Sequence, residues 1–207
     1  MKILFENESL VLALKPAGML SEDAGEGSMV CELRKATGGD ILAVHRLDRA
    51  VGGVMVYAKT KNAAAELSRE GAIEKEYIAV VHGETEDGGE MRDLLFKDSR
   101  ANKSYVVKRV RRGVREAALT YKTLERRGGL SLVSVKLETG RSHQIRVQLA
   151  SRRHPLVGDG KYGASDGTPV ALFCRKITAT LRGDEFTAEA APEGVYPWNI
   201  FDAFKEG

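Results

Sequence analysis

Apolar and polar residues alternate in several short segments of the chain, and elsewhere apolar residues form short continuous runs. Both patterns are typical of β-strands, and the Gly, Asn, Asp and Ser residues between them favour turns. The sequence predicts strands at about residues 2–5, 9–14, 41–44, 53–58, 76–83, 103–110, 117–125, 130–138 and 170–181. Because many of these segments follow one another through short connections, we expect most of the pairing to be antiparallel.

Helical spacing of apolar residues occurs in three places. The predicted helices span residues 28–35, 60–69 and 142–153. Each begins at a residue whose side-chain oxygen can cap a helix, namely Ser28, then Thr60 or Asn62, and Ser142. Gly or Pro follows each helix and can end it. Together the elements indicate an α+β fold in which a mixed, largely antiparallel sheet carries a few flanking helices.

The composition is that of an ordinary globular protein. With 207 residues, 43% of them hydrophobic and 29% charged, the chain can bury a sizeable core, and we expect one catalytic domain over residues 1–207. No apolar run approaches the roughly 20 residues of a membrane span, and the N-terminus lacks the apolar core of a secretory signal. We therefore expect a cytoplasmic protein with no membrane partner, and a monomer.

The segment HRLDRAVGG, residues 45–53, places Asp48 between two arginines. A lone acid in a basic stretch is usually a solvated ion pair that contributes about 0 to 1 kcal/mol. Here Gly52 and Gly53 allow close backbone approach, and the apolar run at 54–58 is suited to a buried strand. Asp48 is therefore predicted to lie beside a core element, which makes it a candidate for chemistry.

Two further residues are candidates for the same site. Arg141 follows Gly140 at the junction between a predicted strand and a predicted helix, where it can reach an acid at a neighbouring strand end. If that acid is Asp48, the arginine would lower the carboxylate pKa by ~1 to 3 units and keep it ionised when buried. Tyr77 is either a core tyrosine or a residue whose flat ring lines a cleft, where a base can stack on it.

Other kinds of site are not indicated. The four histidines lack metal-ligand spacing, so no metal is expected, and Cys31 and Cys174 are expected to be buried free thiols. His45 and His143 are expected to bind the backbone around a site. The segment GVMVYAKT, residues 53–60, has the length of a phosphate-binding loop but lacks its second glycine, and its β-branched residues resist positive φ angles.

The charge of the chain is unevenly distributed. The net charge is only +3, yet the run KRVRRGVR at residues 108–115 holds five cations. Such a run is either a solvated face or a surface for a polyanion.

Several motifs resemble, in order, those of the RluA-type family of RNA pseudouridine synthases. They are HRLDR with Gly53, the segment 75–77, GRSHQIR at 140–146, HPLVGDGKYG at 154–163 and the N-terminal stretch 3–20 with its KPAG turn. The resemblance extends over nearly the whole chain.

This resemblance implies the pseudouridine synthase fold with a central catalytic cleft, and an isomerase that converts uridine in ribosomal or transfer RNA to pseudouridine without a cofactor or metal. Asp48 would be the essential carboxylate, either as a nucleophile at C1′ or as a base that removes the 2′ proton. Tyr77 would pack on the uracil and help remove the C5 proton, and Arg141 would pair with Asp48. The target uridine must be flipped out of the folded RNA, which costs a few kcal/mol. The residues expected to bind RNA are His45, Arg46, Lys75, Lys108, Arg109, Arg111 and Arg112.

The chain departs from the family pattern in places. Val51 and Gly52 replace a usual Thr-Ser pair, and Phe173 and Cys174 replace a usual His-Ala pair. We expect altered loop geometry without loss of chemistry. Because no S4-type module precedes residue 1, the catalytic domain itself, together with residues 100–115, is expected to select the RNA.

Two other functions remain open. A non-catalytic RNA-binding protein would share the basic surface but would have no use for an ionised Asp48. A nucleoside or glycoside hydrolase can also use an acid at an anomeric carbon, but it normally needs a second carboxylate, and none stands out in these motifs.

Overall fold

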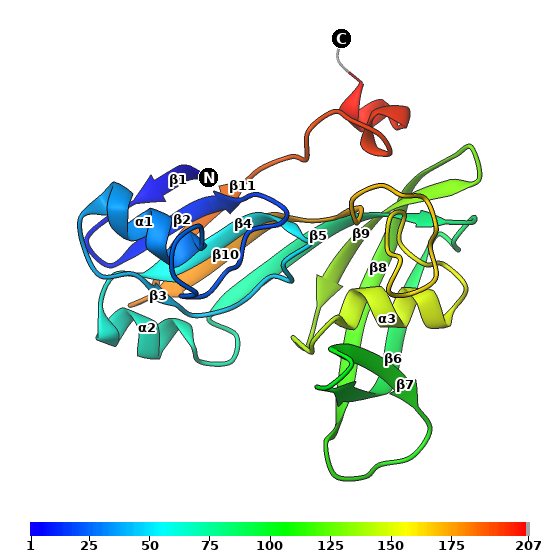
Figure 1. Cartoon of the computed structure of the whole chain (residues 1–207), viewed down its shortest axis with the longest axis horizontal. Helices are drawn as coiled ribbons and strands as arrows, with labels where there is room; N and C mark the ends of the chain where they lie inside the picture. The colour runs from blue at the N-terminus through cyan, green and yellow to red at the C-terminus, as the bar shows by residue number, and fades with distance from the viewer. Residues whose placement is uncertain (206–207) are drawn as a thin grey trace. The chain divides into compact units, whose positions relative to one another are not determined.

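The computed structural model describes residues 1–205 and divides the chain into two compact units (Figure 1). The first unit consists of Met1–Glu76 with Phe173–Pro192, and the second of Tyr77–Leu172 with the segment that begins at Glu193. Strand β5, Ile73–His82, begins in the first unit and ends in the second. The single catalytic domain over residues 1–207 stays a prediction.

The first unit is built on strands that follow the predicted apolar runs. They are β1 (Lys2–Glu6), β2 (Leu10–Lys15), β3 (Leu42–Ala43), β4 (Gly52–Ala58), β10 (Leu172–Leu181) and β11 (Asp184–Glu189). Strand β2 pairs antiparallel with both β1 and β4, and β3 pairs antiparallel with β4. Strand β10 pairs antiparallel with β11 and parallel with β4. Every residue of β4 is buried, so this strand forms the centre of the unit.

Helices α1 (Met29–Thr37) and α2 (Lys61–Leu67) begin where the sequence predicts. The side chain of Ser28 accepts a hydrogen bond from the Cys31 amide, and that of Thr60 accepts one from the Ala63 amide. Gly38 ends α1 in the left-handed conformation, at φ 70°. Residues 53–60, which the sequence excludes as a phosphate-binding loop, form β4 and the start of the turn to α2.

The second unit contains a set of antiparallel strands and one helix. The strands are β6 (Gly88–Asp98), β7 (Lys103–Val107), β8 (Val114–Arg127) and β9 (Leu130–Leu137), and the helix is α3 (Gln144–Ser151). The strands are ordered β7-β6-β8-β9. Two short 3-10 helices, Trp198–Ile200 and Asp202–Phe204, belong to this unit, where Arg127 binds Asp202 at 2.8 Å.

The predicted α+β class with a mixed, largely antiparallel sheet is confirmed, whereas several details are corrected. Strands β6 and β11 were not predicted, and the strand predicted at 103–110 ends at Val107. Ser142 does not cap α3, because His143 precedes the helix in the left-handed region at φ 54°, without a side-chain cap. Neither cysteine forms a disulfide within the described residues, and Cys174 is buried as expected, but Cys31 is only half-buried.

Candidate active site

Asp48 lies in a turn immediately before β4, in the first unit. The turn is closed by a 2.9 Å hydrogen bond from the Val51 amide to the Asp48 carbonyl. On one side of the acid, the Ser21 hydroxyl donates to the Leu47 carbonyl at 2.9 Å and accepts from the Leu47 amide at 3.1 Å. On the other side, Gly18 and Arg49 exchange two hydrogen bonds of 2.7 and 2.8 Å. The backbone on both sides of the carboxylate is therefore held by the segment that follows β2.

Lys15 is a buried cation in the same unit. Its side chain is fully buried, and its ammonium donates to the carbonyls of Pro16 at 3.0 Å and Arg49 at 3.4 Å. Burial lowers the pKa of Lys15 to about 8, while the negative charge of Asp48 acts in the opposite direction. The ammonium is thus mostly protonated at neutral pH and supplies positive charge to the environment of Asp48. The KPAG motif places Lys15 in a turn but does not indicate its burial or its proximity to Asp48.

Replacing Lys15 with Met should reveal this buried charge as a pH dependence of stability. The pKa of Lys15 is about 8 in the folded protein and 10.5 in the unfolded chain. The free energy of unfolding is therefore highest above pH 10.5, where Lys15 is neutral in both states, and it decreases as the pH falls from 10.5 through 8. The free energy of unfolding of the wild type relative to Lys15→Met should rise by about 3 kcal/mol between about pH 7.5 and 10.5. Urea denaturation at several pH values measures this difference. The exposed Lys61→Met should show no such trend, and a flat profile for Lys15 would mean that its ammonium is solvated.

His45 holds β4 as a neutral side chain. Its Nε2 accepts a 3.1 Å hydrogen bond from the Val56 amide, which confirms the predicted contact between His45 and the backbone. Burial and then the charge of Lys75 lower the pKa of His45 well below its ordinary value. Its Nδ1 is buried without a protein partner in the described part of the chain, and it carries the proton because Nε2 accepts. A contact between His45 and RNA stays a prediction.

The unusual residues near Asp48 form a close contact between β4 and β10. A side-chain Cβ on Gly52 would lie 3.5 Å from the Phe173 ring, and Gly53 has a φ of 133° and lies against the Cys174 backbone. The parallel pairing joins Phe173 to Gly52 and Cys174 to Gly53. The two departures from the family pattern therefore pack directly on each other.

The second unit holds the other two predicted catalytic residues. Tyr77 is buried, with 6% of its surface exposed, and the neighbouring Ile78 is 1% exposed. Arg141 is exposed, and its Nε donates to the Glu116 carbonyl at 2.9 Å. Its backbone amide donates to Gln144 Oε1 at 2.9 Å, which fixes the strand-to-helix junction in place of the predicted Ser142 cap.

Arg146 is the buried arginine of the GRSHQIR segment. It is 5% exposed and binds Asp159 through two hydrogen bonds of 2.7 and 2.8 Å. Its guanidinium also lies over the Tyr162 ring, 5.3 Å from the centroid. The Tyr162 hydroxyl in turn hydrogen-bonds with His143 Nδ1 at 2.9 Å. Arg146 was not among the predicted catalytic residues, although the motif HPLVGDGKYG contains its partner Asp159.

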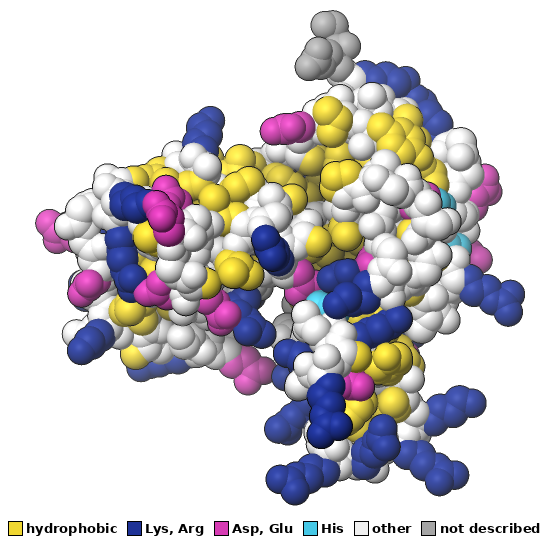
Figure 2. All heavy atoms as spheres, viewed as in Figure 1, with side chains coloured by type: hydrophobic (Ala, Val, Ile, Leu, Met, Phe, Trp, Pro, Cys, Tyr) yellow, Lys and Arg dark blue, Asp and Glu magenta, His cyan; other side chains and the backbone are white. Residues whose placement is uncertain are grey.

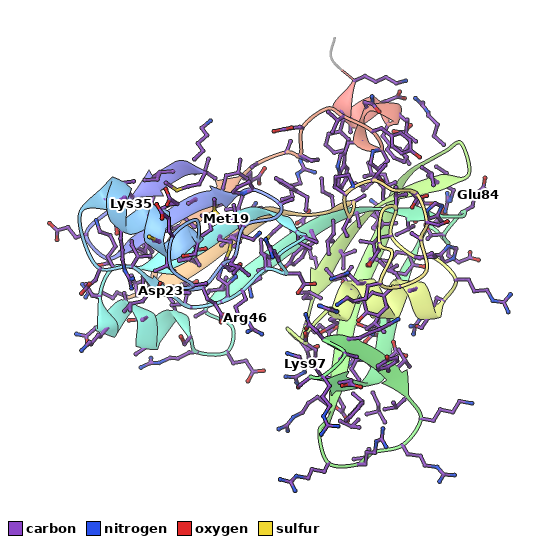
Figure 3. The ribbon with its side chains drawn as sticks, viewed as in Figure 1. Met19, Asp23, Lys35, Arg46, Glu84 and Lys97 are labelled. Carbon is purple, nitrogen blue, oxygen red and sulfur yellow. The ribbon has the colours of Figure 1, made fainter. Side chains whose placement is uncertain are left out.

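The cations predicted to bind RNA occupy different environments. Arg46 is exposed (Figure 3) and pairs with Glu22 at 3.4 Å. Lys75 is half-buried, and burial lowers its pKa. The cluster of Lys108, Arg109, Arg111 and Arg112 is exposed in the loop between β7 and β8. Their contacts with RNA stay predictions.

Within residues 1–205, no group of three or more His, Cys, Asp or Glu side chains is placed to hold a metal ion. None of the helices in that range combines the length and apolar character needed to cross a bilayer.

A family model described as RNA pseudouridylate synthase matches residues 9–151, a range that includes Asp48, Tyr77 and both arginines of the GRSHQIR segment. The chain belongs to this family. Curated relatives of this pseudouridylate synthase family member resemble it at similar levels of sequence identity. The ribosomal large subunit pseudouridine synthase D of Zymomonas mobilis is 33% identical over 188 residues, which cover 84% of this chain and 59% of that protein.

The name of a second relative refers to a different class of RNA. The tRNA pseudouridine synthase C of Vibrio parahaemolyticus is 32% identical, over 84% of this chain and 77% of that protein. The corresponding synthase D of Nitrosomonas europaea is matched over 52% of its length, so the chain spans between about half and three fifths of these D-type relatives.

Solved structures of the pseudouridylate synthase family share the fold. Human RNA Pseudouridylate Synthase Domain Containing 1 has a TM-score of 0.80 at 22% identity, covering 98% of this chain and 86% of that one. Human RNA Pseudouridylate Synthase Domain Containing 4 has a TM-score of 0.74 at 23% identity, covering 92% and 88%. These likenesses concern the fold alone, and they confirm the predicted pseudouridine synthase fold.

Proposed function

We propose that this protein is an RNA pseudouridine synthase that isomerises specific uridines in ribosomal or transfer RNA. The observation that carries the proposal is the family match over residues 9–151, which spans the turn that holds Asp48. Relatives named for large-subunit ribosomal RNA and for transfer RNA are similarly identical, so the proposal covers both RNA classes. We further propose a cytoplasmic monomer that needs no metal or other cofactor, because the reaction only rearranges bonds within one nucleotide.

In this reaction the N1–C1′ glycosidic bond of uridine breaks, the uracil turns, and C5 bonds to C1′. C5 then loses its proton and N1 gains one, so substrate and product are isomers. The carboxylate of Asp48 would begin the reaction, either by attacking C1′ or by removing the 2′ proton to give a glycal. Both routes need an ionised carboxylate in a fixed position, and the hydrogen bonds to Leu47 and Arg49 support such a position.

Tyr77 is proposed to pack on the uracil after the uridine leaves the RNA stack. Stacking of a base on an aromatic ring contributes about 1 to 3 kcal/mol, which offsets part of the cost of base flipping. Phosphate contacts from exposed Lys and Arg would supply the remainder.

The arginine proposed to pair with Asp48 comes from the GRSHQIR segment. The position of Arg141 in the sequence favours it as the partner of Asp48. Burial favours Arg146 instead, because Arg141 is exposed and an exposed ion pair contributes only about 0 to 1 kcal/mol. We expect Arg146→Lys to lower kcat by at least about 100-fold, since two guanidinium nitrogens already bind Asp159 and lysine has no further nitrogen to offer Asp48. Arg141→Lys should lower kcat by less than about 10-fold, as expected for an exposed side chain. Single-turnover kinetics on RNA would measure both.

Urea denaturation of the two lysine variants is the control for that comparison, because Arg146 also neutralises the buried Asp159. A loss of kcat confined to Arg141→Lys, with both variants folded, would assign the pairing role to Arg141.

The proposed activity is tested with cellular RNA that carries tritium at uracil C5. An RNA pseudouridine synthase releases tritium to water, and the new base is then mapped to single positions. Free uracil among the products would instead support the nucleoside or glycoside hydrolase. RNA binding without release of tritium or uracil would support the non-catalytic RNA-binding protein.

A further inference from the structure

The tip of the second unit carries more positive charge than the net charge of the whole chain. We define the basic hairpin as residues 94–115, which comprise the end of β6, strand β7, the following loop and the start of β8. Eight of the 32 Lys and Arg residues but only one of the 29 Asp and Glu residues fall in this range. The basic hairpin thus has a net charge of +7, and the rest of the chain has −4. Figure 2 shows the blue side chains projecting around this tip.

These cations differ from many others on the surface because they are not engaged with acids. In the described range 1–205, none of the eight takes part in an ion pair, whereas Arg34, Arg92 and Arg127 each pair with a carboxylate. Lys97 marks the β6 side of the basic hairpin in Figure 3. A cluster of unpaired like charges is complementary to a polyanion.

The outer face of the basic hairpin is aromatic. Phe96 on β6 lies directly opposite Tyr105 on β7 and Val114 on β8, and directly opposed residues project from the same face of a sheet. The Tyr105 side chain is a large exposed aromatic, with 42% of its surface accessible. The Arg111 guanidinium lies 4.6 Å from the Phe96 ring centroid, and Lys103 Nζ lies 5.7 Å from that of Tyr105.

The opposite face of the basic hairpin is anchored to the body of the unit. Ser104 is buried, and its hydroxyl donates to the Ser142 carbonyl at 2.6 Å while its amide donates to the Tyr162 hydroxyl at 2.9 Å. Lys161 donates to the Asn102 carbonyl at 2.8 Å. These bonds hold β7 in place, so the aromatic face is organised before any ligand binds.

We propose that Tyr105 and Phe96 form a stacking site for an unpaired nucleobase of the RNA, in addition to the flipped uridine, with Lys103 and Arg111 against the neighbouring phosphates. This inference rests on the proposed function and deepens it, because it specifies RNA with an unpaired base outside the reacting nucleotide. A duplex hides its base faces in the stack and would use only the cations. An exposed ring among unpaired cations is instead the arrangement used for single-stranded nucleic acid.

The test measures binding with Asp48→Asn protein, in which turnover does not interfere. The probes are a labelled single-stranded RNA, a stem-loop and a blunt duplex of matched sequence. Tyr105→Ala should weaken binding of the single strand and the stem-loop by about 5- to 100-fold and leave the duplex unchanged. Tyr105→Phe should restore binding, because the ring and not the hydroxyl makes the stack. Tyr196→Ala, which removes another exposed ring, is the matched control and should have no effect.

Salt dependence separates stacking from charge. Arg111→Ala should reduce the slope of log affinity against log salt concentration, whereas Tyr105→Ala should leave that slope unchanged. Equal losses for single strand and duplex in Tyr105→Ala would overturn the stacking site, as would binding to anionic lipid vesicles that depends on Tyr105 while RNA binding does not.

The inference and the proposed function can fail separately. If the wild type releases tritium from RNA but Tyr105→Ala binds single strands normally, the stacking site is wrong and the proposed function stands. If the effect of Tyr105 on binding is found but no tritium is released, the stacking site stands and the proposed function is wrong.

Discussion

Asp48→Asn should abolish pseudouridine formation, with turnover lowered by at least about 1,000-fold. The amide has nearly the size of the carboxylate but can neither attack C1′ nor take the 2′ proton. The turn around residue 48 is held through Leu47 and Arg49 and not through the acid alone, so the variant should fold and keep RNA affinity within a few-fold. Tritium release and RNA binding, measured on the same preparation, check both parts.

The matched control is Asp40→Asn, which removes an exposed acid close in sequence and should leave turnover unchanged. Asp48→Asn should also lower the pKa of Lys15 further below 8, because the charge of Asp48 is what raises it against the effect of burial. Turnover that survives in Asp48→Asn would remove this carboxylate from the mechanism and, with it, the proposed reaction.

Gly53→Ala should be among the most destabilising single substitutions in the protein. Gly53 has a φ of 133°, and a Cβ at this position would lie 2.7 Å from Cys174 Cα and closer still to the Cys174 amide nitrogen and carbonyl oxygen. These are backbone atoms in the parallel pairing of β4 with β10, so they cannot rotate away. We expect a loss of at least about 3 kcal/mol in the free energy of unfolding, or failure to fold.

Gly39→Ala is the control for that substitution, because a Cβ there meets nothing within 4 Å and the backbone is not left-handed. Soluble yield and urea denaturation compare the two variants. A Gly53→Ala protein as stable as the control would contradict the close contact between β4 and β10.

Much of the fold could be predicted because the strongest elements carry local signals. Strand β4 is a continuous apolar run, and all seven of its residues are buried. Helices α1 and α2 begin at the predicted Ser28 and Thr60, since a capping hydroxyl acts within one turn of its own helix. Asp48 could be singled out as well, because two glycines and a buried strand follow it.

The remaining features depend on contacts that are distant in sequence. The polar residues of β6 hide its strand pattern, and Asp93 in that strand binds Arg152, next to the end of α3. The start of α3 is fixed by the Gln144 side chain and not by the predicted Ser142. Burial of Arg146 depends on Asp159, thirteen residues along, and the pKa of Lys15 depends on the charge of Asp48; neither interaction has a local sequence pattern.

The opposite charges of the basic hairpin and the rest of the chain have a kinetic consequence. A polyanion attracts a segment of +7 and repels a remainder of −4, so the protein experiences a torque that orients it before contact. Encounters are thereby enriched in those where the hairpin arrives first, and ions that screen the field reduce this enrichment. The net negative charge of the remainder thus contributes to the choice of docking orientation through repulsion alone.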